Sequence, residues 1–351
     1  MKKAMIYGLG ISGTGAKELL EKEGYEIIIV DDKKAMTSEE ALNHLDGIEF
    51  FIKSPGIPYN NFVKEVQKRG IKILDEIEIA YNYMIEKGMK TKIIAITGTN
   101  GKSTTTAKIS DMLNYAGYKA AYAGNIGRSL SEVLLKEKDL DFISLELSSF
   151  QLENIENFKP YISMIINMGP DHIERYKSFD EYYDTKFNIT KNQTEDLYFI
   201  ENIDDVEIEK RAEQIKAKKI SVSKIKKADI FVKNDKICHG ENSIIDVDKL
   251  SLKGIHNLEN TLFMVATAEI LKIDREKLKE FLMIATPLEH RTELFFNYGK
   301  VKFINDSKAT NVDSTKFAIQ ANKNSILICG GYDKGVDLAP LAEMIKENIK
   351  E

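Results

Sequence analysis

A loop that contains glycine and lysine, set between an apolar run and a helix-forming segment, constrains the fold of this chain more than any other feature. Residues 92–96 are a short apolar run typical of a buried parallel strand, and residues 97–104 have the sequence Thr-Gly-Thr-Asn-Gly-Lys-Ser-Thr. Glycines let backbone N–H groups turn toward an anion, and the N-terminus of the following helix adds positive potential. The loop is shorter than the usual GxxxxGKS/T pattern, because Ile96 stands where that spacing requires glycine. Strand, loop and helix in this order predict a phosphate site in an α/β fold, and a plain strand-to-helix turn is the alternative.

The residues of this loop have separate expected roles in binding ATP and Mg²⁺. Lys102 is expected to contact the β- and γ-phosphates, and Ser103 or Thr104 to place a hydroxyl on Mg²⁺. The expected nucleotide-binding residues of the loop are Gly98, Thr99, Asn100, Gly101, Lys102, Ser103 and Thr104.

The chain before this loop alternates between strand-like and helix-like segments, which is typical of a parallel sheet with helices on its faces. Gly8, Gly10 and Gly13 follow an apolar run, and Asp31-Asp32 ends a second strand. Taken alone, this pattern predicts a dinucleotide site with an acid on a ribose, so an NAD-dependent enzyme is an open alternative. The ATP loop further along favours a different ligand for this region.

A polar stretch near residues 86–91 and the segment near residues 284–287 are the expected boundaries between three units. The expected domains are residues 1–90, a central ATP-binding domain at residues 91–285 and a third unit at residues 286–351. Residues 301–305 and 325–329 are the expected strands of the third unit.

The composition narrows the classes of partner. The net charge is −5, so no basic field is expected to hold nucleic acid. No segment approaches the roughly 20 apolar residues that a membrane-spanning helix needs, so no membrane partner is expected. Cys238 and Cys329 form neither a disulfide framework nor a zinc motif, and residues 1–30 lack a signal-peptide pattern, so a cytoplasmic location is expected.

Further candidate groups follow the loop. Glu146 ends an apolar strand at the edge where open α/β sheets bind ligands, so its carboxylate can complete the shell of a Mg²⁺ ion. His172 ends the segment Asn-Met-Gly-Pro-Asp-His and could bind a second metal, with Asp171 to orient it. Lys186 is a third candidate. Taken alone, each of the three also has a structural interpretation: Glu146 as a surface acid, His172 as a structural histidine and Lys186 as a solvated lysine.

The loop at residues 97–104 resembles the nucleotide loop of the Mur ligases and of the folylpolyglutamate synthases, which use ATP to turn a carboxylate into an acyl phosphate that an amine attacks. Glu-Leu-Ser-Ser-Phe-Gln-Leu-Glu at residues 146–153 and Asn-Asp-Ser-Lys-Ala-Thr-Asn at residues 305–311 are most similar to the D-glutamate-adding Mur ligases. The resemblance implies a three-domain α/β architecture: a Rossmann-like N-terminal domain, a central P-loop ATPase-like domain and a partial Rossmann-like C-terminal domain. It also implies a monomeric ligase that uses ATP and Mg²⁺ to add D-glutamate to UDP-N-acetylmuramoyl-L-alanine in peptidoglycan synthesis.

The resemblance also implies roles for individual residues. The catalytic set is Lys102, Glu146, His172 and Lys186, and the metal ligands are Ser103, Glu146, His172 and Lys186. A carbamylated Lys186 would be an anion that helps to hold a second Mg²⁺, which a bare ammonium would repel. Asn257, Arg291 and Asp306 are implied nucleotide contacts. The implied substrate-binding residues are Ile11, Ser12, Asp31, Asp32, Ser54, Pro55, Gly56, Asn125, Ile126, Gly127, Ser148, Gln151, Lys308, Thr310 and Lys334. Lys308, Thr310 and Lys334 would bind D-glutamate.

One departure from the family pattern concerns the end of the chain. Family members continue for roughly another half-domain of typical size beyond Glu351, which would complete the D-glutamate pocket. We therefore expect a chain truncated in its third unit, and its activity stays open. The remaining alternatives are another Mur or folylpolyglutamate-type amide ligase, and a form that binds the UDP-linked substrate without catalysis.

Overall fold

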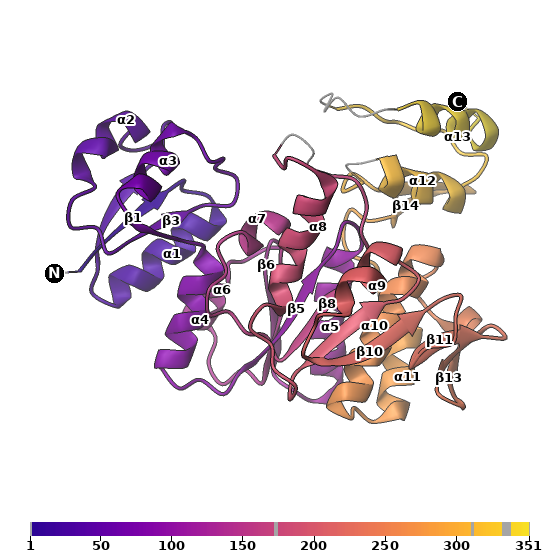
Figure 1. Ribbon diagram of the computed structural model, residues 1–351. Coiled ribbons are helices and arrows are strands. Elements are labelled where there is room, and N and C mark those ends of the chain that lie inside the picture. The colour runs from indigo at the N-terminus through magenta and orange to yellow at the C-terminus, as the bar shows by residue number, and fades with distance from the viewer. Residues whose placement is uncertain (1, 172–174, 310–311, 332–337, 351) are drawn as a thin grey trace.

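Residues 3–74 form a parallel sheet with helices on both faces, as the alternation of strand and helix patterns predicts (Figure 1). The computed structural model describes residues 2–171, 175–309, 312–331 and 338–350. The strands are β1 (Lys3–Tyr7), β2 (Glu26–Val30), β3 (Phe50–Lys53) and β4 (Lys72–Leu74), in the order β2-β1-β3-β4. The helices are α1 (Ile11–Lys22), α2 (Ser38–Ala41), the short 3-10 helix η1 (Leu42–His44) and α3 (Asn61–Lys68).

Successive residues of β1 pack on opposite faces of this first sheet, as the period of a strand requires. Ala4 and Ile6 lie in the apolar cluster on the α1 side, whereas Met5 and Tyr7 lie in the cluster on the α3 side. Glycine is needed where α1 starts, because a Cβ on Gly13 would lie only 1.9 Å from the carbonyl oxygen of Gly8. The glycine pattern therefore allows the helix to pack closely against the end of β1.

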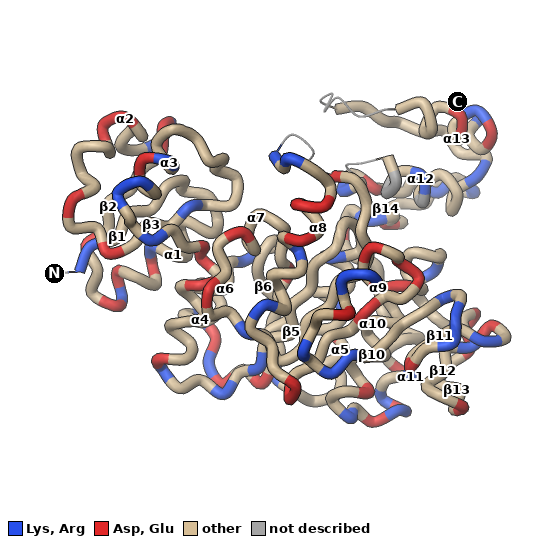
Figure 2. The backbone as a smooth tube through the Cα atoms, in the orientation of Figure 1, with Lys and Arg blue, Asp and Glu red and all other residues tan. Residues whose placement is uncertain are grey.

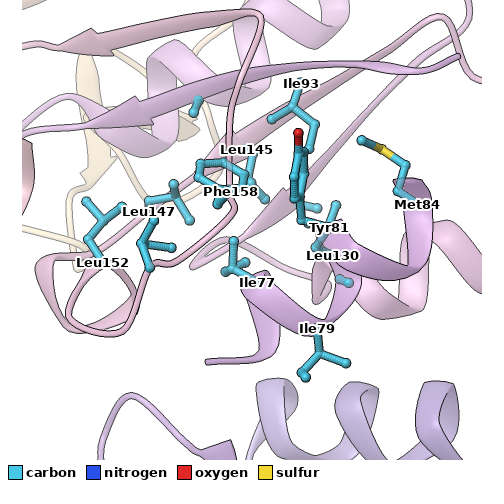
Figure 3. Packing of buried hydrophobic residues seen from close by; sticks show 14 of the residues in the cluster. Ile77, Ile79, Tyr81, Met84, Ile93, Leu130, Leu145, Leu147, Leu152 and Phe158 are labelled. Atoms are coloured by element: carbon cyan, nitrogen blue, oxygen red, sulfur yellow. The ribbon is translucent and has the colours of Figure 1, made fainter. Parts of the chain in front are cut away.

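Helix α4 (Glu76–Glu86) joins the first sheet to the central one, and its apolar side chains pack between them. Figure 3 shows Ile77, Tyr81 and Met84 of α4 beside Ile93 of the central sheet and Leu130. The same cluster includes residues of β1 and α1. The apolar core therefore continues across residue 90, where the polar stretch predicts a boundary.

The central sheet has the strand order β13-β12-β11-β10-β9-β8-β5-β7-β6. Strands from β6 to β11 pair in parallel, and β12 and β13 extend the sheet in antiparallel fashion. Its strands are β5 (Lys92–Thr97), β6 (Ala120–Gly124), β7 (Phe142–Glu146), β8 (Ile162–Ile165), β9 (Tyr198–Asn202), β10 (Lys218–Ser223), β11 (Ile230–Lys233), β12 (Lys236–His239) and β13 (Asn242–Asp246).

Helices cover both faces of the central sheet, which explains why its middle strands are apolar throughout. Ile94 and Ile96 of β5 pack in the cluster that holds α5 (Lys102–Ala116), α10 (Ile255–Leu271) and α11 (Arg275–Ile284). Ile93 and Ala95 pack on the other face with α4, α6 (Leu130–Lys136) and α9 (Val206–Ala212). The remaining short elements are α7 (Ser149–Leu152), α8 (Phe179–Phe187), η2 (Asn188–Thr190) and η3 (Val247–Lys249).

The described residues after 290 form a hairpin and two helices. These are β14 (Glu293–Tyr298), β15 (Val301–Asn305), α12 (Val312–Ala321) and α13 (Ala339–Asn348). The strand predicted at residues 301–305 is β15, but the strand predicted at residues 325–329 is wrong. In the described part of the chain no neighbouring strand pairs with residues 325–329, and Ile328 is 94% exposed. An apolar run becomes a strand only where a second strand satisfies its backbone groups.

Charges of both signs are interspersed along the whole tube in Figure 2. None of the described helices combines the length and the apolarity needed to cross a membrane.

Candidate active site

Adjacent parallel strands of the central sheet end at one edge and bring several predicted groups together. In the register of the sheet, Ile96 of β5 lies opposite Glu146 of β7, and Thr97 lies opposite Ile165 of β8. The phosphate loop after β5 therefore lies between Glu146 and the segment that follows β8. This is the carboxyl edge of the sheet, where open α/β folds bind ligands.

Two glycines give the loop the backbone conformation of a phosphate cradle. Gly98 and Gly101 have φ angles of +146° and +83°, which residues with a side chain rarely adopt. A Cβ on Gly101 would also lie 2.3 Å from Oδ1 of Asn260 on α10. Asn167 fixes the loop from the other side, because its backbone oxygen accepts from Thr99 N at 2.9 Å and its Oδ1 accepts from Asn100 N at 2.8 Å. Helix α5 begins directly after Gly101, so its positive end faces the loop.

The Lys102 ammonium folds back onto its own loop. Its Nζ donates to the carbonyl oxygen of Gly98 at 2.9 Å and to that of Thr99 at 2.8 Å. Burial lowers the pKa of Lys102, while the carboxylates of Glu146 and Asp171 oppose that shift. The amine is therefore held where a phosphate oxygen can replace the two carbonyls as its partner.

Glu146 is a buried carboxylate that is only half satisfied. It is 2% exposed, and its Oε1 accepts from Nδ2 of Asn125 at 3.0 Å. Its Oε2 has no hydrogen-bond partner among the residues that the structure describes. A buried oxygen without a donor costs free energy, and a cation or a ligand donor would relieve that cost. The interpretation of Glu146 as a surface acid is therefore wrong.

Lys186 on α8 is buried as well, so its interpretation as a solvated lysine is wrong. It is 2% exposed, and its Nζ donates to the Gly98 carbonyl at 2.9 Å, the same acceptor that Lys102 uses. Burial and the nearby Lys102 charge lower the pKa of Lys186 well below its usual value, with Asp171 and Glu146 opposing the shift. A lysine in this position has more neutral amine near neutral pH than an exposed one.

A cavity of about 460 Å³ opens beside the loop, and distant parts of the chain line it. Asn257 lines it from the start of α10, and Arg291 and Asp306 line it from the open end of the β14–β15 hairpin. Arg291 Nη2 donates to Ser103 Oγ at 3.3 Å, so the third segment touches the loop itself. Burial raises the pKa of Asp306, and its Oδ1 accepts from Thr292 N at 2.8 Å. Three predicted nucleotide contacts thus share one cavity with the loop.

Other predicted site residues have local partners or lie outside the described structure. Ser148 and Gln151 bond to each other in a capping box at the start of α7. Lys308 is exposed on the segment after β15. His172, Thr310 and Lys334 lie outside the described residues. Within the described ranges, no three His, Cys, Asp or Glu side chains gather closely enough to hold a metal ion.

The predicted substrate residues of the first sheet lie at its carboxyl edge, and several stabilise one another. Asp31 Oδ2 accepts from Leu9 N at 3.0 Å, and that backbone bond lowers the pKa of Asp31. Asp32 Oδ2 accepts from the Tyr7 hydroxyl at 2.6 Å, which lowers the pKa of Asp32. Asp31 therefore holds the glycine turn itself, and Asp32 holds the side chain of Tyr7, which precedes the turn. The other predicted substrate residues that follow β1, β3 or β6 are Ile11, Ser12, Ser54, Pro55, Gly56, Ile126 and Gly127.

Sequence reasoning missed a polar network behind the loop. Glu259 of α10 accepts from Asn167 Nδ2 and from Asn202 Nδ2, each at 3.1 Å, and Lys224 Nζ lies 2.7 Å from its Oε1. Asn202 ends β9 and Lys224 follows β10, in the stretch that carries no recognisable motif. Asn202 and Lys224 could have been identified by their position at strand ends, which is the same signal that marked Glu146 as a candidate.

A sheet with this loop, this buried carboxylate and this neighbouring cavity defines a class of nucleotide-binding enzymes, and comparison with known proteins identifies the family. The model of the Mur ligase middle domain matches residues 96–268. Among solved structures, UDP-N-acetylmuramoyl-L-alanyl-D-glutamate--2,6-diaminopimelate ligase is similar with a TM-score of 0.61 at 18% identity, covering 91% of this chain and 74% of that one. The UDP-N-acetylmuramate-alanine ligase of Thermotoga maritima gives a TM-score of 0.60 at 18% identity, covering 93% and 80%. These likenesses support the three-domain α/β fold.

Curated relatives cover the chain from end to end. A UDP-N-acetylmuramoylalanine--D-glutamate ligase of Fusobacterium nucleatum subsp. nucleatum is 93% identical over 351 residues, which is 100% of this chain and 81% of that protein. A protein of the same name from Natranaerobius thermophilus is 36% identical over 98% of this chain and 81% of its own length. The chain belongs to the Mur ligase family. Within that family, both relatives named here are D-glutamate ligases.

Proposed function

We propose that this chain is an ATP-dependent, amide-forming ligase that joins D-glutamate to UDP-N-acetylmuramoyl-L-alanine in peptidoglycan synthesis. The observation that carries the proposal is the single sheet edge where the phosphate loop, Glu146 and Lys186 meet. The name of the 93% identical relative supports the choice of substrates. The expected setting is a monomer in the cytoplasm.

Each unit of the chain has a separate part in this proposal. Residues 1–90 bind the UDP-linked substrate, residues 91–285 bind ATP, and residues 286–351 contribute to the site for D-glutamate. Lys308, Thr310 and Lys334 are the proposed contacts of the amino acid, and Asn125, Ile126 and Gly127 those of the substrate's pyrophosphate.

The residues at the sheet edge fit ATP and Mg²⁺. The glycine cradle and the start of α5 suit phosphate oxygens. Glu146 Oε2, which has no hydrogen-bond partner within the described part of the chain, and the Ser103 hydroxyl are oxygen ligands of the kind that Mg²⁺ prefers. His172 and a carbamylated Lys186 are the proposed ligands of a second ion. When bound, Mg²⁺ would neutralise charge on the phosphates and on the reacting carboxylate.

The chain's own residues direct a reaction in two stages. In the first, Lys102 exchanges the carbonyls of Gly98 and Thr99 for phosphate oxygens, and Arg291, which also lines the cavity, offsets further negative charge. The alanine carboxylate of the UDP-linked substrate attacks the γ-phosphorus in line, ADP leaves, and an acyl phosphate forms. In the second stage the amine of D-glutamate attacks the acyl carbon, phosphate leaves, and an amide remains. Closure around the cavity protects the acyl phosphate from water.

A phosphate-release assay with UDP-N-acetylmuramoyl-L-alanine, run with and without D-glutamate, tests the proposal. Lys102→Ala should reduce substrate-dependent phosphate release by about a hundredfold or more, because it removes a charge that stabilises the transferring phosphoryl group. The matched control is Lys138→Ala, which removes an exposed lysine of the same unit. Normal phosphate release by Lys102→Ala, or binding of the UDP-substrate by the wild type without any phosphate release, would contradict the ligase proposal.

A further inference from the structure

Two buried or nearly buried cations hold one loop of the first sheet by its backbone carbonyls. The loop is residues 54–57, which follow β3 and include the proposed substrate residues Ser54, Pro55 and Gly56. Lys53 Nζ donates to the carbonyl of Ile57 at 3.1 Å, from the near end of the loop. Arg175, which belongs to the central unit, donates from Nη1 to the carbonyl of Pro55 at 2.7 Å. The loop is therefore held partly from outside its own sheet.

A single carboxylate connects these two cations. Glu153 binds the Arg175 guanidinium with both oxygens, at 3.0 Å to Nε and 2.9 Å to Nη2, and its Oε2 lies 3.3 Å from Lys53 Nζ. The side chains of Lys53, Glu153 and Arg175 are 0%, 11% and 14% exposed. The guanidinium carbon of Arg175 lies over the Phe150 ring, 4.0 Å from the ring centroid. The two bonds to Glu153 and the contact with Phe150 therefore fix the orientation of the planar Arg175 guanidinium.

The loop is in turn connected to the glycine turn of the first sheet. Ser54 Oγ donates to the carbonyl of Gly8 at 2.7 Å, and the turn after Gly8 is held by Asp31. The contacts run without a break from Glu153 through Arg175 and the loop to the turn after β1. Adhesion between the two units does not by itself require a buried ionic cluster, because the apolar cluster of β1, α1 and α4 continues into the central sheet. The same interface also has an exposed ion pair, Lys72 with Glu156.

We propose that Glu153 and Arg175 are positioning residues that hold the loop at residues 54–57 in the conformation that binds the UDP-linked substrate. Neither residue needs to touch the reacting atoms. They align the part of the site that lies on the first sheet with the phosphate loop on the central sheet. This inference rests on the proposed function, since it takes residues 54–56 as substrate contacts.

Two binding titrations on the full chain test this role: one with UDP-N-acetylmuramoyl-L-alanine and one with a non-hydrolysable ATP analogue. Glu153→Gln and Arg175→Lys should each weaken binding of the UDP-substrate about tenfold or more, because either change removes the two-pronged charged contact that fixes the fork. Binding of the ATP analogue should change by less than about twofold, since neither Glu153 nor Arg175 lines the cavity beside the phosphate loop. Arg175→Lys keeps the positive charge in the cluster, so it tests the geometry with the charge balance intact.

The matched control is Glu156→Gln, which breaks the exposed ion pair of the same interface and should leave both affinities unchanged. Unchanged affinity of Glu153→Gln and Arg175→Lys for the UDP-substrate would overturn the positioning role. Equal losses of UDP-substrate and ATP-analogue binding would also overturn it, because they indicate a general loss of structure. A wild-type chain that does not bind the UDP-substrate would overturn the proposed function, and this inference with it.

Discussion

Glu76 at the start of α4 provides a test of how the first sheet is joined to the central one. It is 1% exposed, its Oε1 accepts from Ser131 N of α6 at 2.6 Å, and burial raises its pKa from 4.5 to about 7. The folded state therefore holds a proton on Glu76 that the unfolded chain releases above about pH 4.5. Stability from this group is fully present below pH 4.5 and is lost as the pH rises to about 7.

The size of the effect follows from that difference in pKa. Each pH unit between the two values removes about 1.4 kcal/mol from the free energy of unfolding, so the whole interval removes roughly 3 kcal/mol. Between about pH 5.5 and about pH 7, the expected loss is roughly 2 kcal/mol. Glu76→Gln cannot ionise, so its stability should not contain this slope.

Urea unfolding of wild type and Glu76→Gln across this pH interval measures the difference directly. The wild type should lose about 2 kcal/mol relative to the variant as the pH rises, with no further relative change above about pH 7.5. Glu86→Gln, on the exposed end of the same helix, is the matched control. A wild-type curve that stays parallel to that of Glu76→Gln would mean that Glu76 is ionised throughout, and the argument from burial would fail.

Two further predictions concern the loop and its lysines. Gly101→Ala should weaken binding of an ATP analogue at least tenfold, as measured by calorimetry. The added Cβ meets Asn260, and the positive φ at residue 101 costs about 1–2 kcal/mol for a residue with a side chain. Wild-type affinity in this variant would contradict the role of the loop in binding phosphate. Burial lowers the pKa of Lys186, so more of its amine is neutral and able to react with CO₂. With ¹³C-bicarbonate near pH 8, the wild type should show a carbamate signal in NMR spectra that Lys186→Arg lacks. An identical signal in that variant would assign the carbamate to another amine.

Much of the architecture could be predicted because apolar runs and glycines act locally. The expected strand at residues 142–146 is β7, and the loop follows β5 as predicted. The strand predicted at residues 325–329 was wrong because a strand also needs a partner strand, which the local sequence does not specify. Ile326 and Ile328 have the composition of a strand and yet remain exposed.

The candidate site was predictable where residues follow strand ends and unpredictable where they depend on distant contacts. The place of Glu146 at the end of a strand made it a candidate, and the family resemblance of its segment favoured a site role over that of a surface acid. The burial of Lys186 could not, since the carbonyl it binds belongs to Gly98, far away in the sequence. The contact between Arg175 and Pro55 joins residues 120 positions apart, and no periodicity predicts it.

The cavity beside the loop has a mechanical consequence. One of its walls belongs to the central sheet and another to Arg291 and Asp306, so any occupant touches two parts of the chain at once. Such a ligand stabilises the contact between these two parts. At a concentration of about one hundred times its Kd, it adds about 2.7 kcal/mol to the stability of the arrangement that binds it. Protease resistance should therefore rise with the nucleotide concentration in the buffer.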